Sequence, residues 1–153
     1  GDSTWRNEFM KAFDLEGIAY FNPQKPEWRE EDAVEEAWHL VNDEVILFPV
    51  TDETYAAGSL AESGFSILSA LRSNDQRFVV IYIAPNVCPA LQVADPAAAK
   101  DSARARALVQ AHLKKLNHYN VFVVDSLAQM KEISISLYFA AKAVKDARRL
   151  CTR

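Results

Sequence analysis

The sequence predicts an α/β fold in which a parallel sheet lies between two layers of helices. Its strand-length apolar runs are continuous rather than alternating, which is typical of parallel strands covered on both faces. Segments with helical spacing separate these runs, so each strand is followed by a helix that crosses back over the sheet. Together the two observations predict a three-layer, doubly wound sheet of the flavodoxin or Rossmann-like class.

The predicted strands are the apolar runs at 18–21, 45–50, 78–84 and 121–124. Helical spacing predicts helices at about 4–15, 31–42, 58–73, 96–116 and 127–149. Asp95 before Pro96 is a helix start signal, because an N-cap residue precedes a proline at the first helical position. Ser126 and Gln129 have the spacing of a capping box for the last helix.

The chain opens on residues typical of a loop that leads into a helix, whereas a doubly wound sheet normally begins with a strand. We therefore expect four strands here, with the first strand of the sheet missing from the sequence. No linker or internal repeat interrupts the pattern, so residues 1–153 are predicted to form a single domain.

Composition excludes several classes of protein. Half of the 153 residues are hydrophobic and 25% are charged, which excludes a disordered chain. A net charge of -4 argues against binding to a nucleic acid polymer, and the basic cluster Arg104, Arg106, Lys114 and Lys115 is interpreted as the exposed face of a helix. The sequence has no signal peptide, membrane-length apolar run or cluster with metal-ligand spacing, which predicts a cytoplasmic protein without membrane contact, metal or cofactor.

Cys88 and Cys151 lie far apart in the sequence, and two unmatched thiols fit a reducing compartment. Cys88 has no histidine beside it, so we expect a buried thiol rather than a nucleophile. Trp38 shares the apolar side of its helix with Val34 and Val41, which predicts a core position for its indole ring.

The most informative stretch is Ser59 to Gly64, because it puts the carboxylate of Glu62 at a strand-to-helix crossover. Open α/β sheets bind ligands at the carboxyl ends of their strands, where such crossovers lie. The spacing of Ser59 and Glu62 is also that of a capping box, which most often carries no chemistry. Glu62 is therefore either a functional residue of a ligand site or the third residue of a capped helix.

Further candidates lie just after the apolar run at 18–21 and at the start of the first predicted helix. Asn22 and Gln24 follow the run at 18–21 and either bind a ligand or form a turn around Pro23. Trp5 and Arg6 stand at the start of the first helix. They either bind a ligand or begin a helix that packs into the core.

An ordered set of motifs in residues 4–72 resembles the nucleoside 2-deoxyribosyltransferase-like superfamily. Relatives have an asparagine- or aspartate-proline step after the second strand, an Ala-Asp pair before the third, and a Glu-x-Gly element that opens the next helix. The matching residues are Tyr20-Phe21-Asn22-Pro23-Gln24, Trp28, the stretch 36–48, Thr54 and Ser59-Leu60-Ala61-Glu62-Ser63-Gly64. The chain departs from the family by having Asp43-Glu44 where relatives have Ala-Asp, and by lacking their glycine-rich first strand.

The resemblance implies an enzyme that cleaves the N-glycosidic bond of a nucleoside or nucleotide and passes the sugar to another base or to water. It implies Glu62 as the nucleophile, Asp43 or Glu44 as the assisting acid, and Asn22, Gln24, Trp5, Arg6 and Ser59 as substrate-binding residues. It implies no cofactor, and a homodimer is a further hypothesis because relatives share sites across subunits. The alternative is a catalytically degenerate domain of the same fold that binds a nucleotide or a protein partner without turnover.

Overall fold

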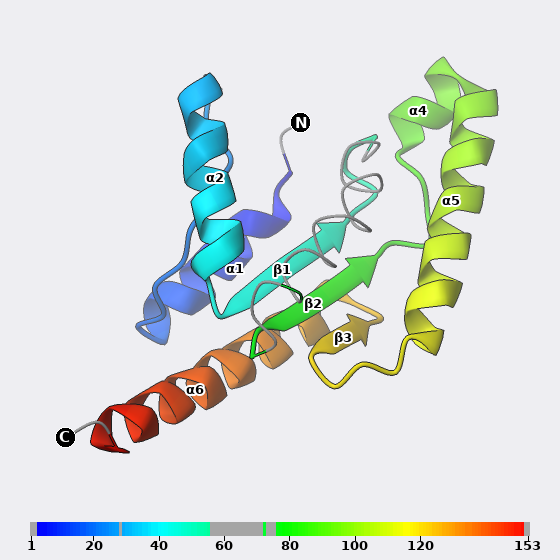
Figure 1. Ribbon diagram of the computed structural model, residues 1–153. Coiled ribbons are helices and arrows are strands. Elements are labelled where there is room, and N and C mark those ends of the chain that lie inside the picture. Colours follow the sequence, from blue (N-terminus) through cyan, green and yellow to red (C-terminus); the bar gives the residue numbers. More distant parts are fainter. Residues whose placement is uncertain (1–2, 28, 56–71, 73–75, 152–153) are drawn as a thin grey trace.

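Three parallel strands form a small open sheet that helices flank (Figure 1), in a computed structural model that describes residues 3–27, 29–55, 72 and 76–151. This arrangement is an α/β fold, compatible with a Rossmann-like fold. The elements in chain order are α1 (Trp5–Leu15), α2 (Glu30–Asn42), β1 (Val45–Val50), β2 (Phe78–Ile83), α4 (Pro89–Ala94), α5 (Pro96–Lys115), β3 (Val121–Val124) and α6 (Leu127–Cys151).

The sheet has the order β1-β2-β3, so β2 is the central strand. Val45 of β1 lies opposite Phe78 of β2, and Val79 of β2 lies opposite Val121 of β3. Val79, Val80 and Ile81 in the middle of β2 are fully buried. A continuous apolar sequence is therefore what this strand requires, because both of its faces are covered.

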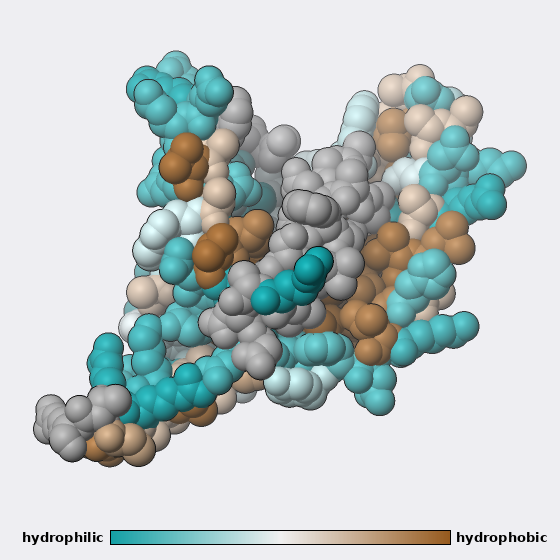
Figure 2. Space-filling model, viewed as in Figure 1, coloured by the Kyte–Doolittle hydropathy of each residue, from teal (hydrophilic) through white to brown (hydrophobic). Residues whose placement is uncertain are grey.

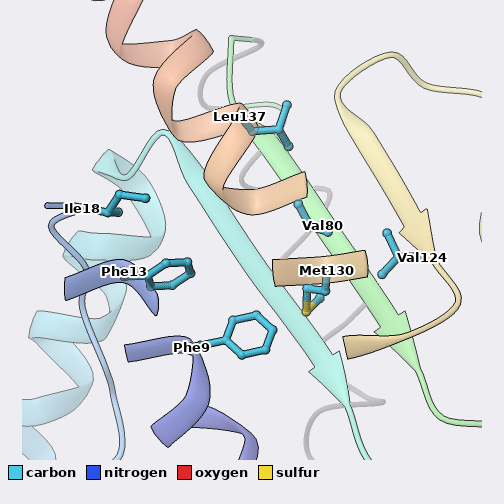
Figure 3. Close-up of a cluster of buried hydrophobic side chains, with 7 residues drawn as sticks. All are labelled: Phe9, Phe13, Ile18, Val80, Val124, Met130 and Leu137. Atoms are coloured by element: carbon cyan, nitrogen blue, oxygen red, sulfur yellow. The ribbon is translucent and has the colours of Figure 1, made fainter. Parts of the chain in front are cut away.

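Two hydrophobic clusters fill the space on either side of the sheet. On one face, α1 and α6 pack against it, and Figure 3 shows Phe9, Phe13 and Met130 pointing toward Val80. On the other face, Val109 and Leu113 of α5 pack against Val50 and its neighbours of β2. The helix α2 lies on the α5 side, beside the outer edge of β1 (Figure 1).

The predicted strand at 18–21 is wrong. These residues belong to no strand, and the described sheet has three strands rather than four. The chain leaves α1 through Gly17, which has a φ of 66°, and the amide of Ile18 donates to the carbonyl of Phe13. No described strand lies beside residues 18–21, and an apolar run becomes a strand only when its backbone groups are paired.

The helix start signals are confirmed. The Asp95 side chain accepts hydrogen bonds from the amides of Ala97 and Ala98 at the start of α5. The Ser126 hydroxyl accepts one from the amide of Gln129, whose own side chain accepts one from the amide of Asp125. The short helix α4 was not predicted, and the predicted helix at 58–73 lies outside the described residues except for position 72.

Two residue-level predictions are wrong. Trp38 is 59% exposed, and the surface of α2 in Figure 2 carries apolar side chains because no described element packs over Val34, Trp38 and Val41. Arg106, expected on an exposed helix face, is only 1% exposed, because its guanidinium turns toward the carboxyl ends of β1 and β2. Cys88 is buried as predicted. Among the described helices, none is both long and apolar enough to cross a membrane.

Candidate functional site

A groove of about 250 Å³ runs along the outer edge of β1. Side chains of α1, residues 20–23, the second half of α2, Asp43 and residues 46–49 of β1 line it, and we call it the edge groove. Most of the lining is apolar or aromatic, and α1 brings Phe9 and Phe13 to one wall. Such a lining with a few polar groups is typical of a site for a small molecule with an aromatic ring.

Trp5 and Arg6 stand at the end of the edge groove that lies nearest the carboxyl end of β1. The start of α1 is held there because the hydroxyl of Thr4 donates to the carboxylate of Glu53, which follows β1, at 3.1 Å. The Trp5 ring packs edge-on against Phe9, with 5.1 Å between ring centroids. Trp5 therefore packs against the core and also lines the groove.

The Arg6 guanidinium lies over the Trp5 ring, with its central carbon 4.7 Å from the ring centroid. One of its nitrogens donates to the hydroxyl of Ser3. Partial burial lowers the pKa of Arg6, and the nearby carboxylate of Glu53 offsets part of that effect. A half-buried cation beside an aromatic ring suits a ligand that combines a ring with an anionic or hydroxyl-bearing group.

Asn22 lines the edge groove, whereas Gln24 does not. The Asn22 side-chain amide lies 3.7 Å from the sulfur of Met10 on α1, and its oxygen accepts a hydrogen bond from the amide of Gln24. This second contact is the turn that an asparagine-proline step predicts. The amide nitrogen of Asn22 thus donates to a weak sulfur acceptor. A stronger acceptor on a ligand can replace the sulfur as its hydrogen-bond partner.

Asp43 and Glu44 lie at the amino end of β1, about 20 Å along the strand from the end beside Trp5 and Arg6. Asp43 lines the edge groove at that end and pairs with His39, with 3.0 Å between nitrogen and oxygen. Glu44 pairs with Lys145 of α6, and this hydrogen bond lowers the pKa of the Glu44 carboxyl. Asp43 is therefore held by a hydrogen bond with His39 and Glu44 by an ion pair with Lys145, and both contacts join a helix to the start of the sheet.

Arg106 holds the carboxyl ends of β1 and β2 together. Its guanidinium donates to the carbonyls of Ala84 at 3.2 Å and Thr51 at 3.0 Å, and more weakly to Val50 at 3.4 Å. Burial lowers the pKa of Arg106, which Asp52 partly counteracts. These contacts explain why the cation is buried: it satisfies the carbonyls of Ala84 and Thr51 just past the strand ends, and it shares the carbonyl of Val50 with the amide of Ala84.

The structure thus brings four of the predicted site residues to one groove: Trp5, Arg6, Asn22 and Asp43. Glu44 and Gln24 lie outside it, and Glu44 lines a second pocket at the amino end of β1. Ser59 and Glu62, together with Trp28, lie outside the described residues. Within the described ranges, no group of three or more His, Cys, Asp and Glu side chains is placed to hold a metal ion.

Sequence reasoning missed His39 and Phe21. Their rings stack with 3.9 Å between centroids and 7° between planes, and His39 covers one side of the groove. A usable signal was present, since His39 and Asp43 are spaced to meet on one helix face. The comparisons add no relative: no protein family model, no curated protein and no solved structure matches this chain.

Proposed function

We propose that this chain acts on the N-glycosidic bond of a nucleoside or nucleotide, either transferring the sugar to another base or releasing it to water. The observation that carries the proposal is that Trp5, Arg6 and Asn22 line one groove, which Trp5 and Arg6 enter near the carboxyl end of β1. Parallel α/β sheets bind ligands at that end of their strands. The resemblance of residues 4–72 to the deoxyribosyltransferase-like superfamily supplies the reaction.

Each groove residue has a role suited to such a substrate. Trp5 offers a ring face for a base, Arg6 a cation for a phosphate or a sugar oxygen, and Asn22 an amide for a base edge. No metal or cofactor takes part in the proposed reaction.

Glu62 supplies the reacting carboxylate in this proposal. As the bond between the sugar carbon and the base nitrogen breaks, the carboxylate bonds to that carbon and the base leaves with a proton from an acid or from water. Water or a second base then displaces the carboxylate. Because Asp43 and Glu44 are paired at the far end of β1, we do not assign the proton transfer to either of them.

The test is a chromatographic assay for released or exchanged base from a panel of 2′-deoxynucleosides and their 5′-monophosphates. Glu62→Gln is the informative variant, because glutamine still serves a capping box but cannot act as a nucleophile. Glu44→Gln is the matched control at the far end of β1. We expect release by the wild type and the control and none by Glu62→Gln. Equal release by all three, or none by any, contradicts the proposal.

The second candidate is a domain that binds a nucleotide without turnover. It is favoured by one observation: two carboxylates beside the groove are engaged, with Glu53 accepting from Thr4 and Asp43 pairing with His39. Quenching of tryptophan fluorescence by nucleotides, lost in Trp5→Leu and kept in Trp38→Leu, would support this function if no base is released.

A further inference from the structure

His39 stands in the wall of the edge groove with its imidazole ring held in one orientation. Its Nδ1 lies 3.0 Å and 3.1 Å from the two carboxylate oxygens of Asp43, one helical turn further along the chain. Phe21 stacks flat on the ring, and Trp38 meets it edge-on with 5.0 Å between ring centroids. A carboxylate and two aromatic contacts thus fix a titratable ring beside a groove, as proton transfer to a bound molecule requires.

The carboxylate of Asp43 also decides which nitrogen of His39 a ligand can use. A carboxylate accepts hydrogen bonds, so Nδ1 carries the hydrogen that Asp43 binds. Within the described chain, Nε2 makes no hydrogen bond. Nε2 is therefore available to a ligand, and in the protonated ring it offers a second N–H.

His39 has Asn22 as a neighbour in the edge groove. Asn22 follows Phe21, which stacks on His39, and its amide nitrogen lies 3.7 Å from the sulfur of Met10. Arg6 stands one helical turn before Met10 and lines the groove beyond it. A base whose edge meets Asn22 therefore has His39 on one side and Arg6 on the other.

A purine carries two adjacent polar groups that match His39 and Asn22. Its ring nitrogen N7 accepts a hydrogen bond, and the substituent on the neighbouring C6 accepts or donates one. Nε2 of His39 suits N7, and the side-chain amide of Asn22 suits the C6 substituent, because an amide can both donate and accept. A pyrimidine has no ring acceptor on the corresponding edge.

We propose that His39 is the catalytic acid of the edge groove and that the substrate is a purine 2′-deoxynucleoside or its monophosphate. The inference rests on the proposed glycosidic function and supplies the proton that the leaving base needs. Protonated His39 gives its Nε2 proton to N7 while the bond between the sugar carbon and N9 breaks. The electron pair of that bond goes to the purine, the sugar carbon bonds to the nucleophile, and both the purine and His39 are left neutral.

Asp43 is a positioning residue in this reaction, and a second pocket gives the proton a way back. His39 and Asp43 also line the pocket of about 420 Å³ at the amino end of β1. The pair therefore borders two spaces, with the substrate in one and access for water from the other. The water or second base that displaces the nucleophile from the sugar releases a proton, which restores the charge on His39.

The other charged side chains around His39 come from α1, α2, the start of β1 and α6. Those of the edge groove, besides Asp43, are Arg6 and Glu36. Those of the second pocket are Glu44, Lys142, Lys145, Asp146 and Arg149, with the phenols of Tyr20 and Tyr138 beside them. Side chains of these types ordinarily change charge outside the range of about pH 5 to 8, in which histidine changes its own. A change of rate across that range is therefore assigned to His39.

The test compares two purine nucleosides that differ in their need for an acid. 2′-Deoxyguanosine needs a proton at N7 to leave, whereas 7-methyl-2′-deoxyguanosine already carries a positive charge there and leaves without one. For the wild type, kcat on 2′-deoxyguanosine should fall about tenfold or more between about pH 5.5 and about pH 8, and kcat on the methylated substrate should stay level. Release measured without protein is subtracted at each pH.

His39→Gln should lower kcat on 2′-deoxyguanosine by about 100-fold or more and leave kcat on the methylated substrate nearly unchanged. Asp43→Asn should lower the first rate by about tenfold or more and spare the second, because the ring loses the carboxylate that orients it. His112→Gln, on an exposed position of α5, is the matched control and should leave both rates unchanged.

Several outcomes overturn the inference. Equal losses on both substrates in His39→Gln mean a merely structural role, and release of pyrimidines alone contradicts the assigned substrate. If His39→Gln does not fold by circular dichroism, the two wild-type pH profiles still decide, and profiles of the same shape refute the acid. Release that His39→Gln leaves intact contradicts this inference alone. A wild type that releases no base from any nucleoside contradicts the proposed function, and the inference falls with it.

Discussion

Replacing Arg106 with methionine should destabilise the protein, although the side chain is charged and lies on a helix rich in surface residues. Methionine keeps much of the volume and the apolar stem but removes every donor. The carbonyls of Ala84 and Thr51 at the strand ends then lose this partner in a region that excludes water, whereas the carbonyl of Val50 keeps the amide of Ala84.

The magnitude follows from these contacts. Two of the hydrogen bonds are 3.2 Å or shorter, and a bond from a charged donor contributes about 1.5–3 kcal/mol. Removal of the buried guanidinium also removes its desolvation cost, the same cost that lowers its pKa. The net loss in the free energy of unfolding should therefore be about 2–3 kcal/mol.

Urea denaturation followed by circular dichroism measures this loss, with Arg104→Met as the matched control on the exposed face of α5. The control should change the free energy of unfolding by less than about 0.5 kcal/mol. If the two variants have the same stability, the reasoning about Arg106 is refuted.

Three further predictions concern other parts of the molecule. Met130→Ala, in the cluster beneath β2, should lower the free energy of unfolding by about 2–4 kcal/mol in the same assay, because the side chain is fully buried. Trp38→Gln should change it by less than about 0.5 kcal/mol, and a larger loss would mean that the exposed indole packs against something in solution. Asp32 accepts hydrogen bonds from Lys25 and from the amide of Arg29, which lower its pKa. The contribution of Asp32 to the free energy of unfolding is thus present above about pH 4 and is lost as the pH falls through the lowered pKa. Asp32→Asn should therefore unfold more easily at pH 7, and its difference from the wild type should shrink as the pH falls below about 4 in urea titrations across pH.

The three strands of the sheet were predictable because their sequences are apolar on both faces. The predicted run 45–50 has the bounds of β1, and the run 78–84 extends one residue past β2. The start of α6 was predictable as well, because a serine cap acts within four residues of sequence. Local chemistry of this kind is present in the sequence itself.

Properties that depend on distant partners were not predictable. The run at 18–21 has strand composition, but composition does not tell whether a neighbour pairs with it. The spacing of Val34, Trp38 and Val41 predicts a common face of α2, which the structure leaves uncovered. For Arg106 the sequence shows a charge on a helix, and only the fold shows that unpaired carbonyls lie opposite it.

The candidate site was predictable in part. Trp5, Arg6 and Asn22 were selected from the sequence and meet in one groove, because the turn after α1 brings the chain back along the helix. The link between His39 and Phe21 was missed because it joins two segments through ring stacking, which leaves no spacing pattern in the sequence.

The all-parallel sheet also has a consequence for how the chain folds. Each strand pairs with a partner about 30 to 40 positions further along the chain, because parallel neighbours need a crossover between them. Such non-local pairing slows folding, since a long loop must close before any contact forms. During synthesis the apolar strand β2 leaves the ribosome before β3 exists to cover its second edge. Chaperone contact or aggregation is therefore most expected in that interval, and the pairing of residues 121–124 with β2 ends it.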